Sequence, residues 1–212
     1  MIILFDLDGT LIDSTDAILE SFHHSFSKHG HECKKDKDIK ALIGYPLDIM
    51  FENLGIEKKE IWDMVATYKE RYREISTQKT ELLKNAREAV LLAKKFATLG
   101  IVTTKTAQYS KELMQHFDLM QYFEVLIGRE DVQNPKPHAE PILKALDKMD
   151  TKNREIWMIG DTKLDIIAAK NANINSIAVL SGYDDLETLK KFTNVIFNDA
   201  LEATFYLQNR KK

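Results

Sequence analysis

The sequence predicts an α/β fold in which a parallel sheet carries helices on both faces and an all-helical segment follows the first strand. From about residue 85 onward, short apolar runs alternate with longer segments of helical period, which is typical of strand–helix–strand units. Residues 1–5 add one more buried strand, whereas residues 15–82 show helical periods and no convincing strand. We therefore expect a core formed by residues 1–14 and 83–212 and a helical cap formed by residues 15–82.

Length and composition fit one domain with a modest insertion. The chain has 212 residues, 44% hydrophobic and 30% charged, with only 8 Gly and 4 Pro, which excludes disordered and collagen-like classes. Thirty basic and 33 acidic residues leave no excess of positive charge for a nucleic-acid backbone. A single cysteine cannot form an internal disulfide, and the apolar start is too short for a signal peptide or a membrane span. We expect a cytoplasmic monomer or homodimer that binds neither nucleic acid nor membrane.

The elements of the core are predicted from the period of the apolar residues. Strands are expected over residues 1–5, 99–103, 123–127, 156–159, 176–180 and 195–197. Helices are expected over residues 85–97, 107–117, 138–149, 164–171 and 186–192. In the cap, apolar stripes recur at helical spacing, and Pro46 stands where a helix can begin at Leu47.

Two carboxylates, Asp6 and Asp8, follow the first predicted strand. In extended backbone, residues i and i+2 point to the same side, so both face the crevice where ligands bind in open parallel sheets. Two like charges so close together need a cation or a shared proton. The alternative is a polar turn by which the strand leaves the core, and this pair alone does not decide between them.

A second acidic pair, Asp161 and Asp165, follows the predicted strand 156–159. Four residues apart, the two carboxylates share one face of a helix that starts near Thr162. A helix cap followed by a solvated aspartate is the alternative. If this strand neighbours the first, however, four carboxylates meet at one end of the sheet and require a divalent cation. Oxygen ligands without a His or Cys cluster favour Mg²⁺.

Hydroxyl groups and a lysine supply what a phosphate group needs. Thr103 and Thr104 end a predicted strand, where hydroxyls and the backbone amides of the next helix start can hold phosphate oxygens. Lys136 lies between Pro135 and Pro137, so its backbone is stiffened and its ammonium group is held in place. Strand threonines without a ligand and an ordinary surface lysine are the alternatives.

In this order along the chain, the motifs resemble those of the haloacid dehalogenase superfamily over nearly the whole length. Asp6-Leu7-Asp8-Gly9-Thr10 is similar to the first motif, Thr103 to the second, Lys136 to the third and Gly160-Asp161-Thr162-Lys163-Leu164-Asp165 to the fourth. The resemblance implies a Rossmann-like core with a helical cap inserted after the first strand.

The resemblance also implies a role for each catalytic residue. Asp6 is expected to be the nucleophile that forms an aspartyl phosphate. Asp8 is expected to protonate the leaving oxygen and then to deprotonate the attacking water. Thr103 and Lys136 are expected to hold the transferring phosphoryl oxygens.

A Mg²⁺ site follows from the same resemblance. The side chains of Asp6 and Asp161 and the backbone carbonyl of Asp8 are the expected ligands, and Asp165 is expected to orient the site. Asn173 stands where these enzymes usually have a glycine at a helix end, and Asn85-Ala86 replaces a frequent Pro-Gly pair. Since asparagine tolerates the left-handed conformation, we expect Asn173 to be a structural substitute.

The motifs also discriminate within the superfamily. A dehalogenase is expected to lack Asp8, and a phosphonate hydrolase is expected to have a lysine in the cap loop at residues 42–47, which has none. This loop resembles that of phosphoglycolate phosphatases and related pyrophosphatases or nucleotidases, so Gly44 and Tyr45, with Thr104, are the expected specificity residues. We therefore expect a phosphatase for a small phosphorylated metabolite, with phosphoglycolate as the first candidate. The alternatives are a pyrophosphatase or nucleotidase, a phosphomutase of the beta-phosphoglucomutase type and, last, a non-enzymatic phosphoryl switch.

Overall fold

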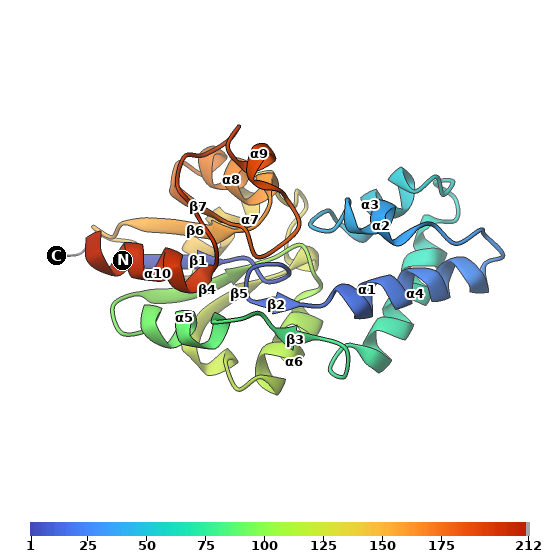
Figure 1. Cartoon of the computed structure of the whole chain (residues 1–212), viewed down its shortest axis with the longest axis horizontal. Helices are drawn as coiled ribbons and strands as arrows, with labels where there is room; N and C mark the ends of the chain where they lie inside the picture. Colours follow the sequence, from blue (N-terminus) through green and yellow to red (C-terminus); the bar gives the residue numbers. More distant parts are fainter. Residues whose placement is uncertain (211–212) are drawn as a thin grey trace. The chain divides into compact units, whose positions relative to one another are not determined.

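The computed structural model describes residues 1–210 and contains two compact units (Figure 1). The core unit consists of Met1–Asp13 together with the chain from Leu82 onward, and the helical unit consists of Ser14–Glu81. None of the helices in this described part of the chain has the length and apolar character that crossing a membrane requires.

A six-stranded parallel sheet with the order β5-β4-β1-β6-β7-β8 forms the centre of the core unit (Figure 1). Its strands are β1 (Ile2–Phe5), β4 (Thr98–Val102), β5 (Phe123–Ile127), β6 (Ile156–Gly160), β7 (Asn175–Val179) and β8 (Ile196–Phe197). Because β1 pairs with β4 on one side and β6 on the other, the carboxyl ends of these three strands are neighbours. The predicted α/β fold class with a Rossmann-like core is confirmed.

Helices cover both faces of the sheet, because every residue of β1 is buried and successive side chains point to opposite faces. Ile3 and Phe5 belong to a cluster that includes residues of α5 (Ala86–Ala93), α6 (Ala107–His116) and α10 (Ala200–Arg210). Ile2 and Leu4 belong to a cluster with residues of α7 (Glu140–Leu146) and α8 (Lys163–Asn171). The remaining helical segments are α9 (Leu186–Leu189) and the 3₁₀ turns η1 (Met120–Tyr122) and η2 (Arg129–Asp131).

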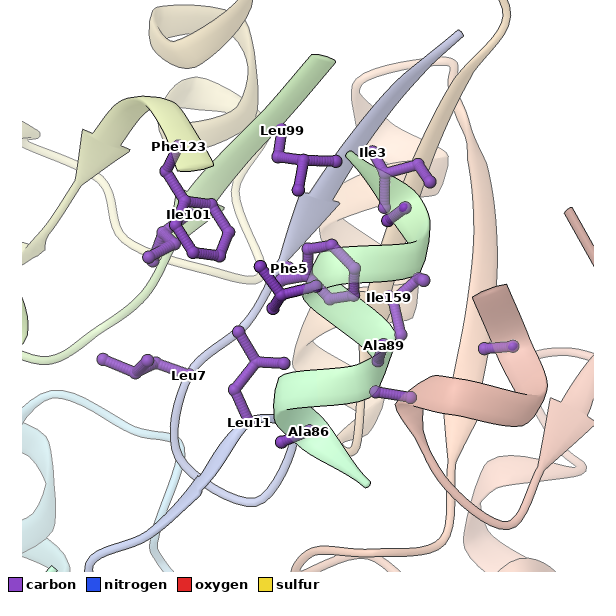
Figure 2. Packing of buried hydrophobic residues seen from close by; sticks show 14 of the residues in the cluster. Ile3, Phe5, Leu7, Leu11, Ala86, Ala89, Leu99, Ile101, Phe123 and Ile159 are labelled. Carbon is purple, nitrogen blue, oxygen red and sulfur yellow. The ribbon is translucent and has the colours of Figure 1, made fainter. Parts of the chain in front are cut away.

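The first of these clusters supports β1 from both neighbouring strands. Figure 2 shows Phe5 among Leu99 and Ile101 of β4, Ile159 of β6 and Ala89 of α5. The ring of Phe5 meets the ring of Phe123 edge to face, with centroids 6.3 Å apart. The strand that carries the first acidic motif is therefore held at the centre of the packed core.

The helical unit contains α1 (Thr15–Lys28), α2 (Asp36–Lys40), α3 (Leu47–Asn53) and α4 (Ile61–Ile75). An aromatic cluster joins them: the ring of Phe22 on α1 lies 4.7 Å from that of Phe51 on α3 and 4.9 Å from that of Tyr68 on α4. The helix predicted to begin at Leu47 does so. Two short strands, β2 (Ile12–Asp13) and β3 (Glu81–Leu82), form a separate two-stranded sheet.

Several predicted elements differ from the observed ones, mostly at their ends. The helix predicted over 85–97 ends at Ala93, that over 138–149 shrinks to α7, and that over 186–192 shrinks to α9. Helix α10 was not predicted, because its buried face consists largely of small residues, Ala200, Ala203 and Thr204, which give a weak periodic signal. Strands β2 and β3 are two residues long, too short for an alternating pattern.

Asparagine replaces glycine at two turns of the core unit. Asn85 and Asn173 both have left-handed backbone, with φ of 65° and 55°. The prediction that Asn173 takes the place of a helix-ending glycine is confirmed, since asparagine is the residue other than glycine that most readily adopts this conformation. Asn85 also donates a hydrogen bond from Nδ2 to Asp199 Oδ2, at 2.8 Å.

We predict that Leu99→Ala lowers the free energy of unfolding by about 2–5 kcal/mol, because it leaves a cavity beside β1. Leu143→Ala is the matched control: Leu99 has no exposed surface, whereas Leu143 is 47% exposed, so its loss should cost less than about 0.5 kcal/mol. Urea denaturation measures both values. Equal losses in the two variants would contradict the assignment of Leu99 to the core.

Candidate active site

The backbone pairing of the sheet continues one residue beyond the strands and places two predicted site residues at the same edge. The amide of Asp6, directly after β1, donates to the carbonyl of Ile159 at 2.9 Å. The amide of Thr103, directly after β4, donates to the carbonyl of Ile127 at 3.0 Å. Asp161 follows β6 directly, so all three lie at the carboxyl ends of adjacent strands.

Three of the four predicted carboxylates form one buried cluster. Asp6 is 4% exposed, and Asp161 and Asp165 have no exposed surface. One carboxylate oxygen from each residue lies within 4.8 Å of those of the other two. Such a cluster, with oxygen donors alone, has the ligand type and the charge that a divalent cation prefers.

Lys136 is buried and bridges two members of this cluster. Its Nζ lies 2.8 Å from Asp6 Oδ1 and 2.5 Å from Asp165 Oδ1, and the residue is 3% exposed. Burial by itself lowers the pKa of the Lys136 ammonium, but the charges and hydrogen bonds of Asp165 and Asp6 outweigh burial and raise that pKa above its ordinary value. A fixed positive charge therefore lies beside the predicted nucleophile.

Asp165 positions its neighbours through both carboxylate oxygens. Oδ1 accepts from Lys136, while Oδ2 accepts from the amide of Thr162 at 3.0 Å and from its hydroxyl at 2.8 Å. Thr162 and Asp165 thereby form a capping box at the start of α8. This geometry suits a residue that orients the lysine and the start of the helix.

Asp161 is enclosed by residues that the sequence analysis did not identify. Its Oδ1 accepts from the hydroxyl of Thr10 at 3.0 Å, and its Oδ2 accepts from the amide of Tyr183 at 2.9 Å. A Cβ atom at Gly9 or Gly182 would overlap this carboxylate, so both positions require glycine. The signal that could have found them is the Gly182 that follows the strand end at Val179 on the same edge.

The cluster carries strong electrostatic strain. Burial raises the pKa of the Asp6 carboxyl to about 7; the charge of Asp165 adds to the rise and Lys136 opposes it. Burial, together with the charges of Asp6 and Asp165, also holds the pKa of Asp161 well above its ordinary value. Three aspartates against one lysine leave a formal charge of minus two, which matches one divalent cation.

Asp8 lies outside this cluster and pairs with a second lysine. Its Oδ2 is 3.1 Å from Nζ of Lys105, and the two side chains are 13% and 8% exposed. The sequence analysis did not identify Lys105, although this residue follows Thr103 and Thr104 at the same end of β4. Asp6 and Asp8, two residues apart, therefore each have their own lysine partner.

The start of α6 does not present its amides to a phosphate, so this expectation is wrong. The amides of Ala107 and Gln108 donate to the carboxylate of Glu130, at 2.8 and 3.5 Å. Glu130 satisfies these amides because an acidic side chain is stabilised at a helix N-terminus. Thr103 is buried, and its Oγ1 accepts from the amide of Lys105 at 3.2 Å. Thr104 is half-buried in the same turn.

The expected specificity residues Gly44 and Tyr45 belong to the helical unit, between α2 and α3. Gly44 has φ of 106°, and a β-bridge joins Ile43 to Tyr45 around it. A residue with a side chain is strained at such a φ, so the tight turn depends on glycine.

Residues 3–179 match the family model of the haloacid dehalogenase-like hydrolases. The chain therefore belongs to this family. It is 35% identical to a pyrophosphatase PpaX of Bacillus mycoides over 192 residues, which cover 89% of this chain and 88% of the relative. It is also 35% identical to a pyrophosphatase PpaX of Halalkalibacterium halodurans, with 84% and 82% covered.

A solved structure agrees with this membership. A predicted phosphatase from Clostridium acetobutylicum superposes with a TM-score of 0.89 at 26% identity, covering 98% of each chain. The resemblance inferred from the motifs and the predicted enzyme class, a haloacid dehalogenase-like phosphatase, are confirmed.

We predict that Gly182→Ala reduces phosphatase turnover by about 100-fold, because the added methyl group displaces the Asp161 carboxylate. The control is Gly55→Ala, where an added Cβ meets no atom within 4 Å but a φ of 89° makes alanine unfavourable. That control should lose stability and keep its turnover. A folded Gly182→Ala variant with wild-type turnover would show that Asp161 is not needed where it lies.

Proposed function

We propose that the protein is a Mg²⁺-dependent phosphatase that hydrolyses a small phosphorylated metabolite through an aspartyl phosphate on Asp6. The observation that carries the proposal is the buried Asp6 carboxylate, held 2.8 Å from Lys136 within a cluster of three aspartates. A nucleophile for phosphoryl transfer needs a fixed position and nearby positive charge, and this arrangement offers both.

The donor set fits Mg²⁺. The side chains of Asp6 and Asp161 and the backbone carbonyl of Asp8 would hold the ion; they are oxygen donors, and the cluster has a formal charge of minus two before a cation binds. When bound, Mg²⁺ would offset the charge of the carboxylates and of the phosphoryl oxygens. Asp165 has both oxygens directed at Lys136 and Thr162, so we assign it to orienting the site.

The reaction then needs only groups at this edge of the sheet. A carboxylate oxygen of Asp6 attacks phosphorus, the bond from phosphorus to the leaving oxygen breaks, and Asp8 gives that oxygen a proton. Asp8 next takes a proton from a water molecule that attacks phosphorus, which releases phosphate and restores Asp6. The Thr103 hydroxyl and the Lys136 ammonium hold the phosphoryl oxygens as their charge redistributes.

We infer inorganic pyrophosphate as the first candidate substrate and phosphoglycolate as the second. The name of the relatives at 35% identity supports pyrophosphate, and the likeness of the cap loop supports phosphoglycolate. Gly44, Tyr45 and Thr104 stay predicted specificity residues. A cytoplasmic location and a monomeric or homodimeric state also stay predictions.

We predict that wild-type protein releases phosphate from these substrates only when Mg²⁺ is present, and that Asp6→Asn lowers turnover to below about 1%. An amide is a poor nucleophile and a poorer ligand for Mg²⁺ than a carboxylate. The matched control is Asp147→Asn at an exposed position of the core unit, which should keep full activity. A phosphate-release assay measures all three proteins. More than a few per cent of turnover in folded Asp6→Asn would overturn the nucleophile assignment.

A further inference from the structure

We propose that Lys105 determines substrate specificity by binding a negative charge on the leaving group. The inference rests on the proposed function and narrows its substrate class. The preferred substrates are phosphoryl compounds whose leaving group carries its own anion close to the scissile bond, such as a second phosphate or a carboxylate. Four features of Lys105 carry this inference: its fixed backbone, its burial, its partner and its place relative to Lys136.

The backbone of Lys105 is held at both ends of the residue. Its amide donates to Thr103 Oγ1 at 3.2 Å, and its carbonyl accepts from the amide of Arg129 at 3.0 Å. The following helix start is fixed by Glu130, which accepts from the amide of Ala107 at 2.8 Å. The turn that presents Lys105 is therefore preorganised.

The side chain of Lys105 is unusually buried for a lysine. It is only 8% exposed, although lysine is among the residues that are most rarely buried. Desolvating an ammonium group is unfavourable unless a counter-charge is close, and Asp8 supplies one at 3.1 Å. The arrangement keeps a positive charge at the sheet edge where the substrate is expected.

The position of Asp8 locates this charge relative to the reaction. As the proton donor, Asp8 must come within about 2.6–3.2 Å of the leaving oxygen, so the Lys105 ammonium lies within about 6 Å of that oxygen. Lys136, in contrast, lies 2.8 Å from the nucleophile Asp6. The two lysines thus serve opposite ends of the scissile bond: Lys136 the transferring phosphoryl group and Lys105 the leaving group.

Charge balance gives the arrangement its selectivity. An anionic leaving group brings additional negative charge to an edge that already carries four aspartates, and an ammonium on that side offsets the repulsion. A neutral leaving group gains nothing from the ammonium. Removing the charge of Lys105 should therefore penalise the first class of substrate and spare the second.

The test compares kcat/KM of wild-type protein and Lys105→Met on matched substrates. Phosphoglycolate is paired with 2-hydroxyethyl phosphate, which replaces the carboxylate by a neutral alcohol, and pyrophosphate is paired with p-nitrophenyl phosphate. We expect Lys105→Met to lower kcat/KM for the anionic member of each pair at least about tenfold more than for its partner, chiefly through KM. Lys105→Arg should recover part of the preference, and Lys111→Met, at an exposed position of α6, should leave it unchanged.

Other outcomes overturn the inference in distinguishable ways. Equal losses on all four substrates would mean that Lys105 only holds Asp8 in place, and unchanged ratios would place it outside the leaving-group site. A wild-type protein that hydrolyses the neutral-leaving-group substrates but neither anionic one would sink the inference and leave the proposed phosphatase intact. Absence of Mg²⁺-dependent turnover on any of the four would instead overturn the proposed function. If Lys105→Met melts below the assay temperature, Lys105→Gln replaces it in the same comparison.

Discussion

Lys136 lies buried between Asp6 and Asp165, and the other groups of the site take their places around this contact. Without the ammonium group, three carboxylates would stand together away from water with no positive charge among them, which is prohibitively unfavourable. Its bond to Asp165 ties it to the start of α8, so the position of the lysine is set by the fold. One buried cation therefore makes an acidic catalytic edge compatible with a stable core.

The parallel sheet supplies the rest of the arrangement through its strand order. Because β1 lies between β4 and β6, the residues that follow these strands converge even though they are far apart in the chain. Glycines then allow the close approach: Gly9 and Gly182 leave room for Asp161, and Gly160 leaves room for Asp165. Packing and charge thus act on the same few residues, which is why small side-chain changes there should affect activity more than stability.

The sheet and the main site residues could be predicted because their signals are local. An apolar run predicts each strand, and an aspartate directly after such a run predicts a carboxylate at the sheet edge. Lys105, Tyr183 and Glu130 could not be found this way, since their roles depend on hydrogen bonds and ion pairs between loops distant in sequence. Helix α10 was missed because its buried residues are small, and helix ends because fraying turns keep a helical pattern in sequence.

The central claim is that Asp6, and not a neighbouring aspartate, accepts the phosphoryl group. The most direct measurement uses an Asp8→Asn variant, in which the loss of the base should slow hydrolysis of the phosphoenzyme. After mixing with Mg²⁺ and substrate, the protein is quenched in acid, reduced with borohydride and mapped by peptide mass spectrometry. The account predicts reduction at Asp6 alone, dependent on substrate. Modification at Asp161 or Asp165, or none at Asp6 while substrate is consumed, would contradict it.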